Sequence, residues 1–173
     1  MSSSLSIENE SSLSLDPEVT QDENEVITLT SNDNVSFTCT YKEIKCSNML
    51  VSAFTDSKNN ETKENDDNNI ILSNIDGKTL NLIVKFLKEH NGVEPPLPEK
   101  PVKSKDMKEI TTEWMANFVD DIVKDNKESL YKVISAANYL FINSLLHICC
   151  AKIASMIKGI PLEEIKDELL PKK

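Results

Sequence analysis

Residues 133–159 (VISAANYLFINSLLHICCAKIASMIKG) contain two lysines and no acidic residue, and this apolar run constrains the fold more than any other segment. Its spacing predicts two helices joined by a short turn at residues 141–144. One apolar stripe runs down the first helix and comprises Leu130, Val133, Ile134 and Ala137. The second helix, from about Leu145 to Ile157, is apolar around most of its circumference. Such a helix must be covered by other helices, by another protein, or by both.

The first half of the chain predicts a small sheet. Ile27 and Leu29 alternate with polar residues, residues 31–34 form a turn, and strict alternation resumes at residues 35–41. This pattern predicts a β-hairpin. The elements expected next are a short helix at residues 47–54, a flexible loop at 56–69 and a short buried strand at 70–72.

The second half predicts helices. Asp76 is expected to cap a helix that ends at Asn91-Gly92. A proline-rich connector at residues 94–108 then leads to a helix that starts near Trp114. Thr111 or Thr112 is expected to cap the N-terminus of the Trp114 helix, and Asp125 that of the Leu130 helix. A last short helix is expected to begin at Leu162 and to be broken by Pro171. Strands early and helices late predict an α+β fold.

The chain is acidic, with a formal net charge of −10, and much of this charge lies at its start, where residues 1–25 hold seven acidic side chains and no lysine. We expect this segment to be a disordered acidic arm, because it cannot bury enough apolar surface to offset the entropy of ordering. Every basic residue is a lysine. The lack of arginine and the negative charge both argue against binding to nucleic acid.

The sequence has no uncharged apolar stretch long enough to span a membrane, and its start lacks the pattern of a secretory signal. We therefore expect a cytoplasmic and nuclear protein without membrane association, whose four cysteines are thiols. The cysteines and histidines show no metal-ligand spacing, so we expect neither metal nor cofactor. Catalysis by Cys149 or Cys150 with His147 is disfavoured, because they lie on a covered helix with no glycine-rich loop nearby.

Several short motifs occur together in this chain. The most specific are Ala136-Ala137-Asn138-Tyr139-Leu140, the double leucine Leu145-Leu146 with Cys150 four positions after it, and Met156-Ile157-Lys158-Gly159. Weaker matches are Ser31-Asn32-Asp33, Leu72-Ser73-Asn74-Ile75, Pro95-Pro96, the Trp114–Phe118 pair and Glu163-Glu164-Ile165. By these motifs the chain closely resembles the S-phase kinase-associated protein (Skp) family over about residues 26–167.

The resemblance implies a BTB/POZ fold, a small early sheet packed by helices, over residues 26–140. A shortened C-terminal helical segment at residues 141–173 would bind an F-box protein. Members of that family are adaptors of cullin-RING ubiquitin ligases. The implied function is therefore that of a non-catalytic adaptor that links a cullin to an F-box substrate receptor in an SCF E3 ligase, in support of ubiquitin-dependent protein degradation.

The resemblance also implies which residues meet each partner. Cullin contact is carried over to Asn138 and Tyr139, and a polar amide beside a phenol is a suitable exposed recognition pair. F-box contact is carried over to Ile148, Ile153, Met156, Ile157 and Ile165. The near all-round hydrophobicity of their main helix is what a surface for another helix requires.

Two other binding roles stay open at this point. One is an elongin C-like module that accepts a different receptor. The other is a BTB module that self-associates as a homodimer when no partner is bound, because a shortened C-terminus leaves apolar surface that can pair with itself.

Overall fold

The computed structural model describes residues 22–59 and 68–169. Most of the expected acidic arm therefore lies outside the described residues. Its last four residues are described, and they contact the folded chain: Glu23 and Glu25 form ion pairs with Lys45 and Lys58, each with an N–O distance of 2.5 Å. The contacts of the folded chain thus begin a few residues before Val26.

The sheet has three strands in the order β2-β1-β3. β1 (Val26–Ser31) pairs antiparallel with β2 (Ser36–Thr40) and parallel with β3 (Asn69–Leu72). The hairpin prediction is confirmed, although β2 is shorter than expected because Tyr41 already begins a helix. β3 was predicted to be buried, and this is wrong for Ile71, which is 67% exposed. Side chains alternate along a strand, so Ile71 lies on the opposite face of the sheet from the buried Leu72.

Three helices pack around the sheet. α1 (Tyr41–Ile44) begins with a capping box made by Thr40 and Glu43. α2 (Asn48–Asn59) runs five residues past its expected end at Phe54, so the predicted loop at 56–69 starts too early. α3 (Gly77–His90) is capped by Asp76 and ends at Asn91, which has the left-handed conformation, and both features confirm the sequence prediction.

Beyond α3 the described chain contains a connector without helix or strand, followed by helical elements. A single 3₁₀ turn (Met107–Glu109) follows the connector, and the helices after it are α4 (Glu113–Asp125), α5 (Lys127–Tyr139), α6 (Asn143–Ile157) and α7 (Leu162–Leu169). Thr112 caps α4, as expected. The prediction of Asp125 as the cap of α5 is wrong, because the Asn126 side chain accepts the hydrogen bond from Glu128 N.

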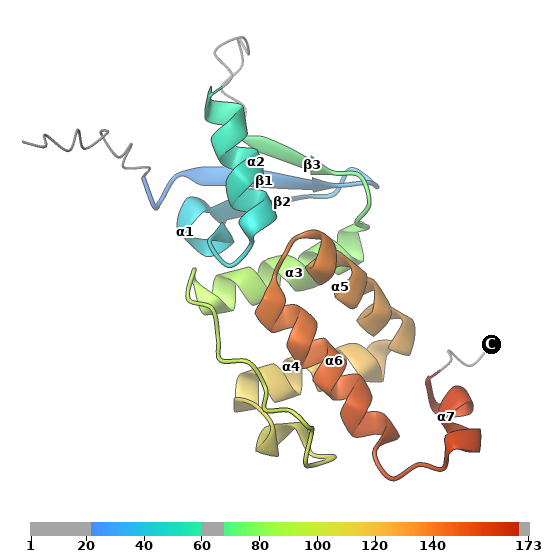
Figure 1. Cartoon of the computed structure of the whole chain (residues 1–173). Coiled ribbons are helices and arrows are strands. Elements are labelled where there is room, and N and C mark those ends of the chain that lie inside the picture. Colours follow the sequence, from blue (N-terminus) through green and yellow to red (C-terminus); the bar gives the residue numbers. More distant parts are fainter. Residues whose placement is uncertain (1–21, 60–67, 170–173) are drawn as a thin grey trace, which may run out of the picture.

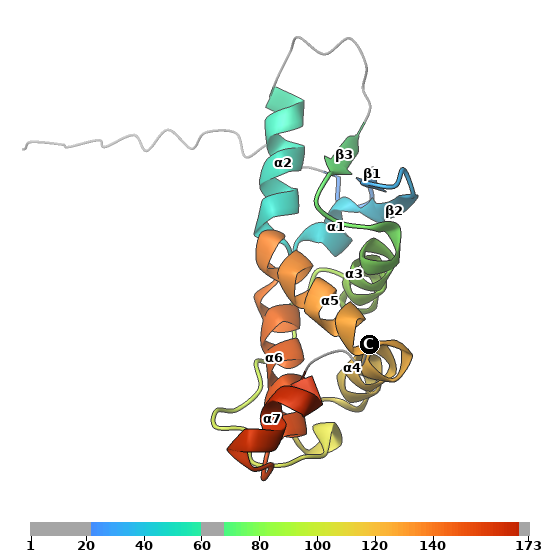
Figure 2. The same cartoon turned by 90° about the vertical axis from the view of Figure 1, so that its right-hand side faces the viewer.

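The sheet and α2 lie at one end of the molecule and α4 and α7 at the other, with α3 and α5 between them (Figure 1). α6 runs from the level of α3 and α5 toward the end that carries α7. Viewed from the side, α2 and α6 follow one another along one side of the molecule (Figure 2). One continuous core joins both ends, from Ile27 and Leu29 of the sheet to Ile148 of α6. The α+β class is confirmed, with a small sheet packed by helices. Within the described ranges, no helix is both long enough and apolar enough to cross a bilayer.

Candidate protein-binding surfaces

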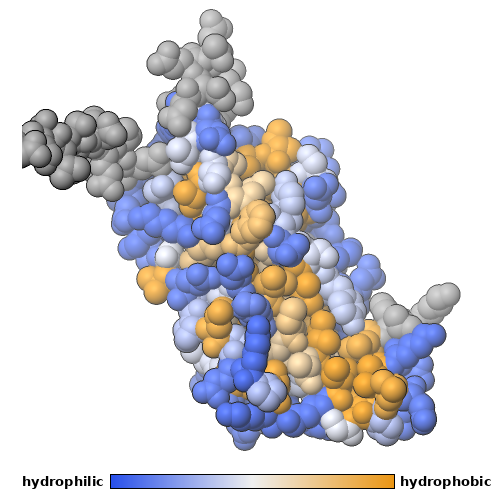
Figure 3. Space-filling view, viewed as in Figure 1, coloured by the Kyte–Doolittle hydropathy of each residue, from blue (hydrophilic) through white to orange (hydrophobic). Residues whose placement is uncertain are grey.

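α6 carries apolar side chains on its open side as well as on its inner side. Ser144, Leu145, Ile148 and Cys149 face the core and are buried, whereas another set at helical spacing reaches solvent in part. We define this second set as the α6 stripe; it consists of Leu146, Cys150, Ile153 and Ile157. The residues repeat every three or four positions, so they lie in one line along the helix. Figure 3 shows hydrophobic surface running along α6 and onto α7.

The predicted F-box residues divide between the two sides of α6. Ile153, Met156 and Ile157 are half-buried and remain accessible. Ile148 is fully buried in the core, so the structure does not place it on the open side, and it supports the helix from within. Leu146 and Cys150 were missed, although they lie seven and three positions before Ile153, which is helical spacing.

α7 packs beside the far end of α6. The Tyr131 hydroxyl on α5 donates a 2.6 Å hydrogen bond to the Leu169 carbonyl, which fixes the end of α7. Ile165 is half-buried, while Leu162 at the start of α7 is largely exposed. α7 therefore extends the apolar surface of the α6 stripe rather than sealing it.

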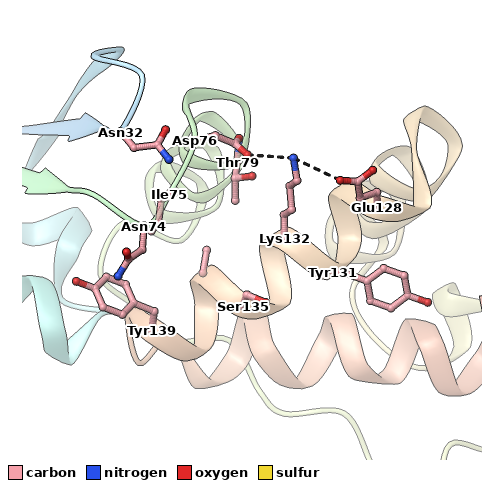
Figure 4. Close-up of a pocket in the computed structure, with 11 residues that line it drawn as sticks. Asn32, Asn74, Ile75, Asp76, Thr79, Glu128, Tyr131, Lys132, Ser135 and Tyr139 are labelled. Atoms are coloured by element: carbon pink, nitrogen blue, oxygen red, sulfur yellow. Dashed lines mark hydrogen bonds and ion pairs between the residues drawn. The ribbon is translucent and has the colours of Figure 1, made fainter. Parts of the chain in front are cut away.

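Asn138 and Tyr139 lie at the C-terminal end of α5, and both side chains are exposed, as expected of a recognition pair. Tyr139 lines one end of a groove of about 460 Å³ between α5 and the loops beside the sheet. In Figure 4 its ring lies next to Asn74. The groove does not extend to Asn138, so the two predicted cullin residues face different surroundings.

Charged residues that pair with one another line part of this groove. The Lys132 ammonium lies 3.3 Å from Asp76 Oδ2 and 3.6 Å from Glu128 Oε1 (Figure 4). The Thr79 backbone N–H, and after it Lys132, hold the pKa of Asp76 below its usual range, and Asp76 raises the pKa of Lys132. These pairs join the start of α3 to α5 and so hold the helix that carries Tyr139.

Phe141, directly after α5, occupies a position normally taken by glycine. Ile142 N donates to the Ala137 carbonyl and Phe141 N to the Asn138 carbonyl, which is the hydrogen-bond pattern of a Schellman motif with Phe141 at C′. Its φ is 53°, and its side chain is 59% exposed. A left-handed conformation costs a bulky residue roughly 1–2 kcal/mol. Phe141 borders a shallow open hollow of about 530 Å³, the α2 hollow, with Asn48, Met49, Ser52, Ala53 and Asp56.

The cysteines are not arranged as nucleophiles. Burial raises the pKa of the Cys39 thiol to about 12, and it also raises the pKa of the Cys46 and Cys149 thiols. Cys150 is exposed, but it lies on the α6 stripe. His147 on the same helix has a buried Nδ1 without a hydrogen-bond partner in the described part of the chain. A raised thiol pKa disfavours the thiolate that covalent catalysis needs.

Comparison with known protein families agrees with this geometry. A family model described as the Skp1 family, dimerisation domain, matches residues 143–169, which are the bounds of α6 and α7 taken together. The match therefore covers the segment that carries the α6 stripe.

Individual relatives extend the similarity over most of the chain. The E3 ubiquitin ligase complex SCF subunit sconC of Arthroderma otae is 30% identical over 140 residues, which are 81% of this chain and 79% of the relative. The S-phase kinase-associated protein 1 homolog of Tetrahymena thermophila is 35% identical over 100 residues, 58% of each protein. SKP1-like protein 11 of Arabidopsis thaliana is 33% identical over 97 residues, 56% of each protein.

Proposed function

The chain belongs to the Skp1 family, and on that premise we propose that it is a non-catalytic adaptor linking a cullin to an F-box substrate receptor in an SCF E3 ubiquitin ligase. The adaptor would thereby support ubiquitin-dependent degradation of the proteins that the receptor selects. Its location in the cytoplasm and nucleus is part of the same proposal.

The observation that carries the proposal is the α6 stripe. Leu146, Ile153 and Ile157 remain partly accessible although they are large and apolar, and Leu162 of α7 continues the surface. A surface of this kind fits the apolar face of a partner helix. Full burial of such a side chain contributes about 1.5–3 kcal/mol, from which the cost of association is subtracted.

The end of α5 supports the cullin half of the proposal. Asn138 and Tyr139 are exposed at the end of the helix, whereas Ala136 and Ala137 just before them are buried. They precede α6 in the chain and lie near its N-terminal end, whereas α7 follows its C-terminal end. A cullin on the end of α5 and an F-box protein on the α6 stripe would therefore not exclude one another. This separation is what an adaptor needs.

The thiols support a binding role rather than a catalytic one. The three buried cysteines have raised pKa values, and the exposed Cys150 lies within the proposed F-box surface. A residue in that position would be covered by the partner in the assembled complex.

The test is affinity purification from cells that express the tagged chain, with mass spectrometry scoring cullins and F-box proteins. Asn138→Lys combined with Tyr139→Lys is expected to remove the cullin and to retain the F-box protein. Asn81→Lys combined with Asn117→Lys is the matched control, because these exposed asparagines on α3 and α4 receive the same change in charge. Recovery of the chain with only itself, or with a receptor that has no F-box, would refute the proposal.

A further inference from the structure

The strain at Phe141 has no compensation within the described chain. The two other non-glycine residues with positive φ among the described residues are Asn34 and Asn91, and asparagine tolerates this conformation. Phenylalanine does not, and its ring is mostly in solvent, so burial of the ring does not offset the strain. Ile142, the next residue, fills the apolar position of the motif and is fully buried. The turn thus depends on Ile142, and glycine at position 141 would adopt the left-handed conformation at a lower steric cost than phenylalanine.

The surroundings of Phe141 have the character of a docking site. Met49, Ala53 and Phe141 give the α2 hollow an apolar lining. Asp56 lies on the rim, exposed and without an ion-pair partner in the described part of the chain. An apolar side chain flanked by a lysine or arginine matches this arrangement, and the overall acidity of the chain favours a basic partner.

The α2 hollow and the proposed cullin surface are both lined by residues at the C-terminal end of α5 or directly after it. Phe141 is two residues from Tyr139, and both precede α6 in the same turn region. Tyr139 lines the groove beside α5, and Phe141 lines the α2 hollow. One amphipathic helix crossing the end of α5 would therefore meet both aromatic side chains.

We propose that Phe141 is an affinity-determining anchor for the cullin, and that the α2 hollow receives an apolar side chain from one of its helices. The inference rests on the proposed function and adds to it a residue that the motif Ala136-Ala137-Asn138-Tyr139-Leu140 does not include. The backbone strain at Phe141 is retained because the side chain acts in binding, in the way that strained residues collect at functional sites.

The experiment measures two properties of the same variants: the affinity for a purified cullin N-terminal domain by isothermal titration calorimetry, and the midpoint of thermal unfolding. Phe141→Gly is expected to weaken cullin binding by about tenfold, as truncation of a central interface aromatic does. The same substitution is expected to raise the unfolding midpoint by about 2–4 °C, because it relieves the left-handed strain in a chain of this size.

Two further variants separate the side chain from the backbone. Phe141→Leu keeps both an apolar side chain and the strain, so it should retain most of the affinity and leave the midpoint unchanged. Leu97→Asn removes another exposed apolar side chain, in the connector before α4, and should leave cullin affinity unchanged.

The outcomes distinguish this inference from the proposed function. If the wild-type chain binds the cullin and Phe141→Gly binds equally well, the role of Phe141 is refuted while the adaptor function stands. If Phe141→Gly lowers the midpoint, the premise of unrelieved strain is wrong and the inference fails. If the folded wild-type chain does not bind the cullin, the cullin half of the proposed function fails, and the inference fails with it.

Discussion

The Lys152 ammonium of α6 lies 2.7 Å from Asp120 Oδ1 of α4, and the two side chains are only 15% and 30% exposed. Asp120 Oδ1 is buried and no hydrogen bond of good geometry reaches it from the described part of the chain, so the ion pair with Lys152 is its main interaction. The pair holds the inner side of α6 against α4. It adds to the burial of Leu145, Ile148 and Cys149, which also keeps the α6 stripe on the open side of the helix.

Asp120→Asn is therefore expected to lower the free energy of unfolding by about 1–3 kcal/mol, because it leaves a half-buried ammonium without its counter-charge. Urea denaturation followed by circular dichroism measures the change. Asp121→Asn is the control, since Asp121 pairs with Lys124 at 3.4 Å on an exposed surface and should change stability by less than about 0.5 kcal/mol. Equal effects of the two substitutions would show that the Asp120 pair does not hold α6.

Asp76 makes the free energy of unfolding depend on pH. Its carboxylate accepts a 2.8 Å hydrogen bond from Thr79 N at the start of α3, which, with Lys132, lowers its pKa in the folded protein. A lowered pKa stabilises the folded state above the unfolded pKa near 3.8, and this contribution is lost as pH falls through the folded pKa. Asp76→Ala should thus cost about 1 kcal/mol at neutral pH, from loss of the cap.

The difference between wild type and Asp76→Ala should become smaller below about pH 4, where the unfolded carboxyl of the wild type is protonated. Urea titrations between pH 7 and pH 2.5 measure it, within the range where the wild type remains folded. Asp76→Asn keeps a capping side chain and should recover most of the loss at neutral pH. A difference that stays constant over this range would contradict the role given to the carboxylate.

Cys150 is expected to be the one thiol among the four cysteines that iodoacetamide modifies quickly at pH 8, because the three others are buried and have raised pKa values. Intact mass spectrometry counts the modified thiols. In the presence of an F-box domain the modification should slow markedly, since Cys150 lies on the α6 stripe. Unchanged modification in a complex whose formation is verified would remove Cys150 from the interface.

The elements with strong local signals were predictable from the sequence. The hairpin follows from strict alternation, and Asp76, Asn91 and Thr112 mark helix ends because their side chains or backbone conformations satisfy helix-terminal groups. The Thr40–Glu43 capping box of α1 was equally visible and was missed. Its spacing is the signal that would have ended β2 before Tyr41.

The orientation of α6 was not predictable in the same way. A helix that is apolar on nearly every side has no polar face to indicate which side meets solvent. Neighbouring helices decide this, and they bury Ile148 while leaving Ile153 accessible. The cap of α5 is a similar case, because Asp125 and Asn126 are both good caps and the end of α4 selects Asn126. The domain boundaries and the assignment of cullin and F-box contacts to particular residues remain predictions.

The backbone strain at Phe141 also could not be predicted from the sequence. Nothing in the residue types marks position 141 as left-handed, since phenylalanine is a poor choice for C′. The backbone had to be seen before the exposed ring could be recognised as an unfavourable residue in that turn.

The most direct test of the account measures binding of a purified F-box domain to the chain by isothermal titration calorimetry, with Ile153→Glu on the α6 stripe and Ile71→Glu on β3 as the matched control. Both substitutions place a charge at an accessible isoleucine, and circular dichroism verifies that both proteins are folded. We expect Ile153→Glu to abolish binding and Ile71→Glu to leave it intact. F-box binding that survives Ile153→Glu unchanged would contradict the claim that the open side of α6 receives the substrate receptor.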